Sequence, residues 1–305
     1  MNEEAARKVL LVRAIETSDT QHQLLSDDDR RYASRSAGEL AQWEAAETGA
    51  AVTPSLFLQK RADQIVERLS VRMPAFGVFA RARLWPRGLD LGLPLLALAI
   101  GAAIDRIADP HRVDLLSGPF LLIVLWNLVV YAVLLASLLR PSGNPGLPWR
   151  RLQGRFAVPR KLPPAMATIL GKFALDWAEQ SAPLQRARAA RLFHFAAAAF
   201  AAGALLSLYA RGILVQYQAG WESTFLNAAQ VHTLLSILFA PAMAVFPLPG
   251  FTLAEVAALQ AGRGSAAANG ALWVHLYAAT LLLLVILPRL LLGLAAGWRA
   301  RRLAG

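Results

Sequence analysis

The sequence predicts an all-α, polytopic membrane protein with about four transmembrane helices, and two observations support this. Four apolar stretches of roughly twenty residues are present, at 89–108, 115–139, 192–209 and 272–291. A helix that rises 1.5 Å per residue needs about that length to cross a hydrocarbon core of about 30 Å. The second observation is composition, since 56% of the 305 residues are hydrophobic and only 17% are charged. We therefore expect membrane spans joined to smaller aqueous parts.

Charge and cysteine content exclude several classes of protein. The formal net charge is +11, but the basic residues gather beside the apolar stretches and form no aromatic-flanked basic cluster, so we expect no nucleic-acid partner. The chain has no cysteine, which excludes disulfides, thiolate metal sites and cysteine nucleophiles. Because the first apolar stretch follows more than eighty residues, we expect it to be an anchor rather than a cleaved signal peptide.

The distribution of arginine and lysine predicts the orientation. Residues 140–191 contain ten Lys or Arg against only Asp176 and Glu179, and further arginines follow the last apolar stretch. Residues 211–271 contain few basic residues. Because short cytoplasmic loops are enriched in Lys and Arg, we expect four crossings with both termini and the 140–191 loop in the cytoplasm.

One segment leaves the number of crossings open. Residues 231–246 are apolar over about sixteen positions, which is short for a span, and His232 and Pro241 interrupt them. If this segment crossed, the C-terminal arginines would lie outside, against the positive-inside bias. We prefer an interfacial or re-entrant helix on the far side, and a five-span topology is the alternative.

The sequence then divides into six parts. Residues 1–85 are expected to form a helical cytoplasmic domain, because apolar residues recur at helical spacing. Helix starts are predicted at Ser26, at Thr53 before Pro54, at Ser181 and at the Thr252–Glu255 capping box. The other parts are spans one and two (86–139), a basic cytoplasmic loop (140–191), span three (192–210), an outer cap (211–271), and span four with a basic tail (272–305).

Several runs of the sequence resemble a bacterial membrane family catalogued as domain of unknown function 2868. They are residues 13–16, 57–62, 105–135, the run Tyr-Gln-Ala-Gly-Trp-Glu-Ser-Thr-Phe-Leu at 217–226, and 273–277 leading into 287–290. The resemblance implies a bacterial inner-membrane location. It implies no activity, since none is established for the family. Members are often encoded beside a predicted GTPase, which points to a cytoplasmic GTPase-like partner.

The first candidate functional residues are Trp221, Glu222, Ser223 and Thr224, just outside the third span. Their carboxylate and hydroxyls are suited to bind a cation or a polar ligand. The structural alternative is that Ser223 or Thr224 caps the following helix, with Glu222 at its positive end and Trp221 in an interfacial belt. On that helix Ser223, Asn227 and Gln230 are expected to share one polar face.

Asn127 and Arg289 are the candidate residues within the spans. Asn127 lies near the middle of the second span, where its amide needs partners inside the protein. Arg289 follows Pro288 and has two alternatives. It either snorkels to the inner headgroups, or it faces the bundle after a kink and needs a carboxylate or carbonyl partner. His194 and His275 lie near span ends, so neither predicts a proton relay.

Other chemistry is not predicted. Asp105, Asp109, His111 and Asp114 crowd one outer loop, but so short a loop rarely supplies a complete metal shell, and we expect ordinary loop charge and no metal site. The sequence has no phosphate-binding loop, no His-Glu-x-x-His pair and no Gly-x-Ser-x-Gly elbow. We therefore expect no cofactor and no enzymatic activity.

These observations lead to three functional hypotheses. We prefer a non-enzymatic membrane anchor or scaffold that recruits a GTPase-like protein through residues 1–85 and 140–191. The first alternative is a channel or transporter that forms a homo-oligomer, since four spans enclose little space. The second is a membrane enzyme that acts at the periplasmic surface through Glu222.

Overall fold

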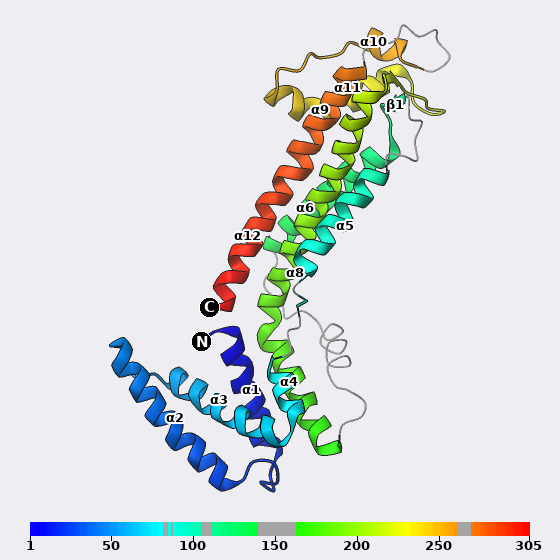
Figure 1. Ribbon diagram of the computed structural model, residues 1–305. Helices are drawn as coiled ribbons and strands as arrows, with labels where there is room; N and C mark the ends of the chain where they lie inside the picture. The colour runs from blue at the N-terminus through cyan, green and yellow to red at the C-terminus, as the bar shows by residue number, and fades with distance from the viewer. Residues whose placement is uncertain (82–84, 87, 105–111, 140–162, 261–269) are drawn as a thin grey trace. The chain divides into compact units, whose positions relative to one another are not determined.

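A computed structural model describes the chain except for residues 82–84, 87, 105–111, 140–162 and 261–269. The described residues are mostly helical and include almost no strand, which confirms the predicted all-α class. The chain divides into two compact units (Figure 1). The first unit comprises Met1–Pro86, Gly143–Ala187 and Trp298–Gly305, and the second unit comprises Arg87–Ser142 and Arg188–Gly297.

The first unit contains four helices in its N-terminal part. They are α1 (Glu3–Ser18), α2 (Asp27–Thr48), α3 (Pro54–Arg72) and α4 (Pro74–Arg81). The predicted caps at Ser26 and Thr53 are confirmed, since each side chain accepts a hydrogen bond from a backbone N–H in the first turn. α2 ends at Gly49, whose φ of +64° is a left-handed conformation that glycine adopts without strain.

Apolar faces of α1, α3, α4 and the first part of α8 (Pro164–Leu214) form the core of the first unit. Its fully buried side chains include Leu11, Ile15, Ile65, Leu69, Phe76, Ile169 and Leu170. The buried apolar residues of α2 form a ladder of alanines, one every four residues, at Ala33, Ala37, Ala41 and Ala45. Alanines at this spacing allow the α2 backbone to approach a neighbouring helix closely.

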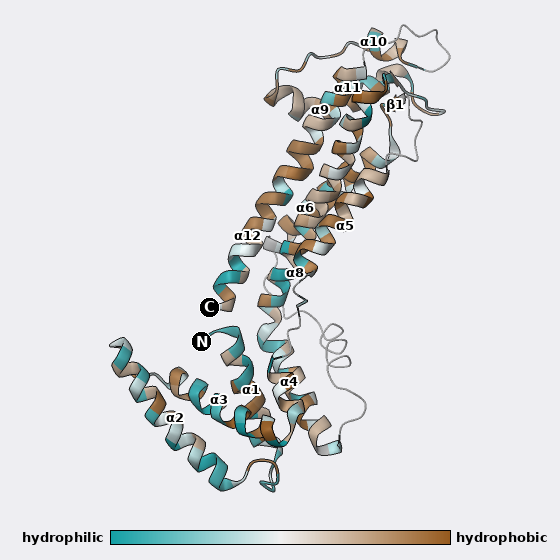
Figure 2. Ribbon diagram, in the orientation of Figure 1, coloured by the Kyte–Doolittle hydropathy of each residue, from teal (hydrophilic) through white to brown (hydrophobic). Residues whose placement is uncertain are grey.

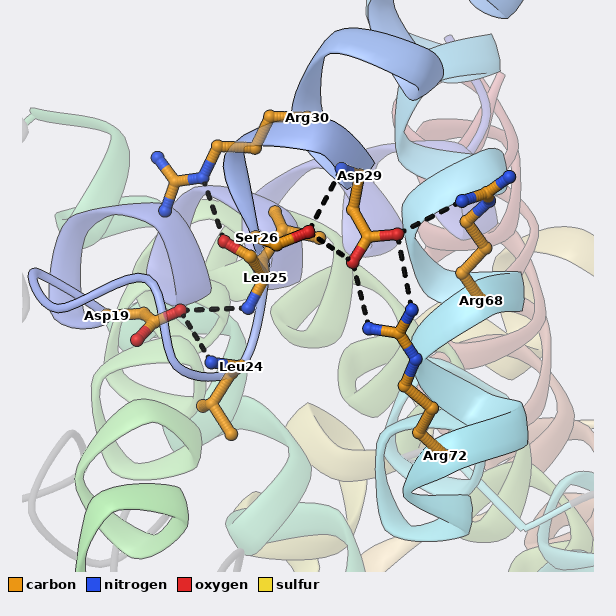
Figure 3. A network of polar contacts seen from close by, with 8 residues as sticks. All are labelled: Asp19, Leu24, Leu25, Ser26, Asp29, Arg30, Arg68 and Arg72. Atoms are coloured by element: carbon orange, nitrogen blue, oxygen red, sulfur yellow. Dashed lines mark hydrogen bonds and ion pairs between the residues drawn. The ribbon is translucent and has the colours of Figure 1, made fainter.

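A buried carboxylate fixes the start of α2 to α3 (Figure 3). Asp29 accepts hydrogen bonds from Arg68 at 3.0 Å and from Arg72 at 2.8 Å, and also from the hydroxyl of Ser26. The Arg72 guanidinium is the main reason that the pKa of Asp29 falls to about 2. The ionised form of Asp29 therefore stabilises this unit.

Asp19 orders the loop between α1 and α2 in a similar way (Figure 3). Burial opposes its ionisation, but backbone N–H groups of residues 23–25 donate to its carboxylate and hold its pKa below the ordinary value. The ionised carboxylate thus accepts hydrogen bonds from backbone N–H groups for which the loop itself supplies no backbone acceptor.

The second unit consists of apolar helices with a small cap at one end, and Figure 2 shows hydrophobic residues along these helices. The helices are α5 (Leu89–Ile104), α6 (Gly118–Leu139), the second part of α8, α9 (Ala228–Val245), α10 (Leu253–Ala258), α11 (Gly270–Leu281) and the first part of α12 (Leu287–Ala304). A π-helix, Leu282–Ile286, joins α11 to α12 in one continuous rod. Strands β1 (Arg112–Asp114) and β2 (Gln218–Gly220) pair in parallel.

Four helices of the described chain are long and apolar enough to cross a membrane, at 118–137, 166–214, 228–245 and 270–304. Two of them contain the third and fourth apolar stretches of the sequence, and the helix at 118–137 covers most of the second stretch. The described part of α5 has 16 residues and is shorter, and residues 105–108 of the first predicted span lie outside the described chain.

The remaining helix, α9, covers nearly all of the segment whose crossing the sequence left open. By length and composition it is able to span a membrane. Figure 1 shows it lying across the end of the second unit, near the start of α11, rather than along that helix. Its buried face, Val231, Leu235, Phe239 and Ala242, packs against the cap and the start of α11.

The helix start predicted at Ser181 is wrong. α8 runs without interruption from Pro164 to Leu214 and passes through Pro183, so the predicted loop at 140–191 is helical from residue 164 onward. The helix continues because buried apolar residues recur at helical spacing on both sides of the proline, at Leu170, Phe173, Trp177 and Leu184. This packing outweighs the single backbone hydrogen bond that proline removes.

Two glycines allow α5 and α8 to pack with their backbones in contact. A Cβ on Gly101 would lie 2.0 Å from the carbonyl oxygen of Phe200, and one on Gly203 would lie 2.1 Å from that of Leu98. Membrane helices associate through small residues of this kind, because lipid provides no hydrophobic driving force between them. This contact attaches the short helix α5 to the bundle.

Candidate functional site

A buried arginine lies among the helices of the second unit. Arg289 on α12 is only 5% exposed. Its Nε donates a 2.6 Å hydrogen bond to Oδ1 of Asn127 on α6, and its Nη1 lies 3.1 Å from Nδ1 of His194 on α8. Three helices that are distant in sequence thus converge on one guanidinium group.

The geometry around His194 determines its chemical form. A guanidinium group only donates hydrogen bonds, so Nδ1 of His194 must accept and carries no proton. The ring is therefore neutral, with its proton on Nε2. Protonation of Nδ1 would replace this hydrogen bond with two cations 3.1 Å apart.

Asn127 is fixed from its other side. Its Nδ2 donates a 2.7 Å hydrogen bond to the carbonyl of Ile123, one turn earlier on α6. This orients the amide so that Oδ1 points at Arg289. The side chain is 4% exposed, and both ends of its amide have partners inside the protein, as expected for an amide within a span.

A local irregularity in the last helix turns the Arg289 side chain toward the bundle. Pro288 has no N–H to give to the carbonyl of Leu284, four residues earlier, and the π-helix lies immediately before it. The hydroxyl of Tyr131 on α6 donates to that carbonyl at 3.0 Å. The same tyrosine ring lies beneath the Arg289 guanidinium, 5.3 Å from its centroid.

The charge of Arg289 has only neutral partners among the residues that the structure describes. Its acceptors are an amide oxygen and an imidazole nitrogen, and no described carboxylate lies within ion-pair distance. Arginine stays protonated at any physiological pH. The bundle therefore holds a permanent positive charge, which makes this cluster the candidate functional site.

The sequence identified part of this cluster. It named Asn127 and Arg289, and the structure brings these two side chains into contact. Arg289 faces the bundle and has the amide carbonyl of Asn127 as its partner, so the snorkelling alternative is wrong. His194 was placed near an interface and not assigned to the site. Tyr131 was missed, although it lies one turn after Asn127 on the same helix face, a spacing that would have indicated it.

Trp221 and Ser223 have structural roles in the second unit. Trp221 is fully buried in the cap, and its Nε1 donates to the carbonyl of Val256 at 2.7 Å, so it does not belong to an interfacial belt. Ser223 accepts hydrogen bonds from the backbone N–H groups of residues 225 and 226 and so forms a turn. Glu222 and Thr224 are exposed beside it.

The expected polar face on the following helix is also wrong. α9 begins at Ala228, and its N-cap is Asn227, which forms a reciprocal capping box with Gln230. Ser223 precedes the helix and therefore shares no face with these two residues. Their polar groups satisfy the helix end and do not line a pathway along it.

The predicted loop cluster of acids and one histidine lies largely outside the described residues, since 105–111 are not described. Within the described chain no group of three His, Asp or Glu side chains is placed to hold a metal ion. The capping box at Thr252 and Glu255, in contrast, is confirmed.

The fold and the buried cluster define a multi-pass α-helical membrane protein. The family described as "Protein of unknown function (DUF2868)" matches residues 142–305, which is more than half of the chain, and the chain belongs to this family. The match includes His194 and Arg289, and it includes the 217–226 run. Asn127 and Tyr131 precede it. No curated protein and no solved structure is detectably similar to the chain.

Proposed function

We propose that this protein is a non-enzymatic inner-membrane scaffold whose first unit recruits a cytoplasmic GTPase-like partner. The observation that supports this is the first unit itself, a folded helical domain with its own apolar core and its own ion-pair network. A protein that only had to stay in the bilayer would not need such a domain. The nature of the partner comes from the family resemblance.

The bilayer is the second partner of this proposal. On α6 the exposed side chains are large and apolar, and they include Leu122, Leu125, Trp126, Val129, Val133 and Leu135. Such a face is unfavourable in water and favourable against lipid. The buried side of the same helix carries Phe120, Val124 and Asn127, which pack within the protein.

Exposed apolar side chains of the first unit are the contact points that we expect for a soluble partner. Trp43 on α2 is 67% exposed and Val71 on α3 is 82% exposed. Exposed aromatic residues often contribute most of the free energy of binding in protein interfaces. These positions offer substitutions that leave the core of the unit intact.

The test is affinity purification of the tagged full-length protein from its native membrane, followed by identification of the proteins that accompany it. We expect a GTP-hydrolysing protein with the unchanged chain, and at least tenfold less of it with Trp43→Ser or Val71→Ser. The matched control is Phe225→Ser, which alters a 92% exposed apolar residue in the second unit. Equal recovery from all four proteins, or recovery of no such protein, would contradict the proposal.

The second candidate is a channel or transporter that works as a homo-oligomer, and the Arg289 cluster favours it. Ionisable residues inside a membrane are costly and commonly mark solute pathways. Solute flux into liposomes that contain the purified protein tests this candidate. If flux above that of empty liposomes is absent, or if Arg289→Met leaves it unchanged, the cluster is not a pathway. A third candidate is an enzyme acting through Glu222 at the periplasmic surface, and the described residues show no comparable buried cluster around that side chain.

A further inference from the structure

We propose that Arg289 and His194 form an intramembrane binding site for a small monovalent anion, a halide or a short carboxylate. The proposal names the ligand class for the second candidate function, and it does not depend on the scaffold role. It rests on the balance of charge and of hydrogen-bond donors in the buried cluster.

Charge comes first. Arg289 contributes one full positive charge at 5% exposure, and among the described residues its partners Asn127 and His194 are both neutral. A cation in the membrane region is costly, and a negative charge beside it lowers this cost further than neutral acceptors do. One monovalent anion supplies the missing charge, whereas a dianion would reverse the imbalance.

The hydrogen-bond inventory selects the same ligand. A guanidinium group has five N–H groups, and the contacts of Arg289 with Asn127 and His194 use two of them, while the neutral ring of His194 carries a further N–H on Nε2. Asn127 already uses its N–H₂ on the carbonyl of Ile123. The cluster thus offers donors to a ligand that only accepts, which excludes metal cations and ammonium groups.

Burial limits the size of the ligand. His194 is 8% exposed and Asn127 is 4% exposed, so the cluster is closed to a bulky phosphodiester headgroup. Chloride, formate and acetate are small enough to sit beside a guanidinium group. The π-helix next to the site is consistent with such a role, since π-helical turns inside α-helices occur frequently at functional sites.

The test compares the thermal unfolding of the purified full-length protein in detergent in sodium chloride, in sodium acetate and in sodium gluconate at equal ionic strength. A ligand that binds only the folded state raises its stability. We expect chloride or acetate to raise the apparent melting temperature by about 3 °C over gluconate, as about 1 kcal/mol does in a chain of this size. The salt that gives the higher melting temperature, chloride or acetate, shows whether the site prefers a halide or a carboxylate.

The decisive variant is Asn127→Asp. It places a carboxylate where Oδ1 already lies 2.6 Å from Arg289, so it supplies the missing charge from within and keeps the side-chain volume. We expect the protein to fold and the anion-dependent shift to disappear. The conservative variant His194→Gln, which retains an acceptor and a donor, should keep part of the shift.

Each unfavourable outcome overturns the proposal. A wild-type protein with the same melting temperature in all three salts has no anion site. A shift that persists in Asn127→Asp is a general salt effect. A shift that persists in Arg289→Met, which removes the guanidinium group, is likewise a general salt effect. The scaffold proposal fails through its own purification experiment and is unaffected by any of these results.

Discussion

The hydroxyl of Tyr131 donates a 3.0 Å hydrogen bond to the carbonyl of Leu284, the group to which Pro288 has no N–H to offer. α6 therefore satisfies a backbone acceptor in the rod formed by α11 and α12. The same tyrosine ring lies under the Arg289 guanidinium. One side chain thus supports both the irregular backbone of the last span and the charge that follows it.

Replacing Tyr131 with Phe should destabilise the protein by about 1 kcal/mol, because the Leu284 carbonyl loses its donor while the ring stays in place. The apparent melting temperature of the full-length protein in detergent measures this, with an expected fall of about 3 °C. Tyr209→Phe is the matched control, since the Tyr209 hydroxyl contacts His275 and its side chain is more exposed. Equal effects of the two substitutions would show that the Tyr131 hydroxyl has no special role.

Gly101→Ala should weaken the contact between α5 and α8. The new Cβ would lie 2.0 Å from a backbone oxygen, so the helices must separate, and overpacking of this kind typically costs about 1–3 kcal/mol. Gly92→Ala is the control on the same helix, because a Cβ there meets no heavy atom within 4 Å. Thermal unfolding of both variants measures the difference. If Gly92→Ala destabilises as much as Gly101→Ala, the close contact is not the cause.

Local signals in the sequence predicted the helix caps at Ser26, Thr53 and Thr252 and most of the spans, since both depend on neighbouring residues alone. The partners of Arg289 were beyond such signals, because Asn127 lies 162 positions earlier in the chain. The start of α9 was mispredicted for a tertiary reason. Ser223 and Asn227 are both good N-cap residues, and Ser223 forms a turn directly after the buried side chain of Trp221.

Asp29→Asn should remove an acid-sensitive part of the stability of the first unit. The pKa of Asp29 is about 2 in the folded protein and close to 3.9 in an unfolded chain. The ionised carboxylate therefore stabilises the fold above about pH 4, and this contribution is lost as the pH falls toward 2. Because Arg68 and Arg72 are partly exposed, we expect about 1–2 kcal/mol at neutral pH.

Unfolding of the first unit at pH 7 and at pH 3, followed in the full-length protein, measures the contribution of Asp29. The unchanged protein should lose more stability on acidification than Asp29→Asn does. Asp28→Asn serves as the control, because Asp28 is the exposed neighbouring acid on the same helix turn. If Asp28→Asn and Asp29→Asn respond alike, the arginine pair does not stabilise the charge.

The chain contains no cysteine, so a single introduced cysteine is the only thiol available for a topology measurement. Thr224→Cys and Gly250→Cys lie on either side of α9, and both positions are exposed. If α9 lies across the end of the bundle without crossing, a membrane-impermeant maleimide should label both from the periplasmic side. It should not label Leu303→Cys near the C-terminus until the membrane is opened.

If α9 crosses, Thr224→Cys and Gly250→Cys are labelled from opposite sides, and Leu303→Cys becomes accessible from outside. The labelling pattern of these three variants thus decides between four and five crossings, and with them the side on which the C-terminal arginines lie.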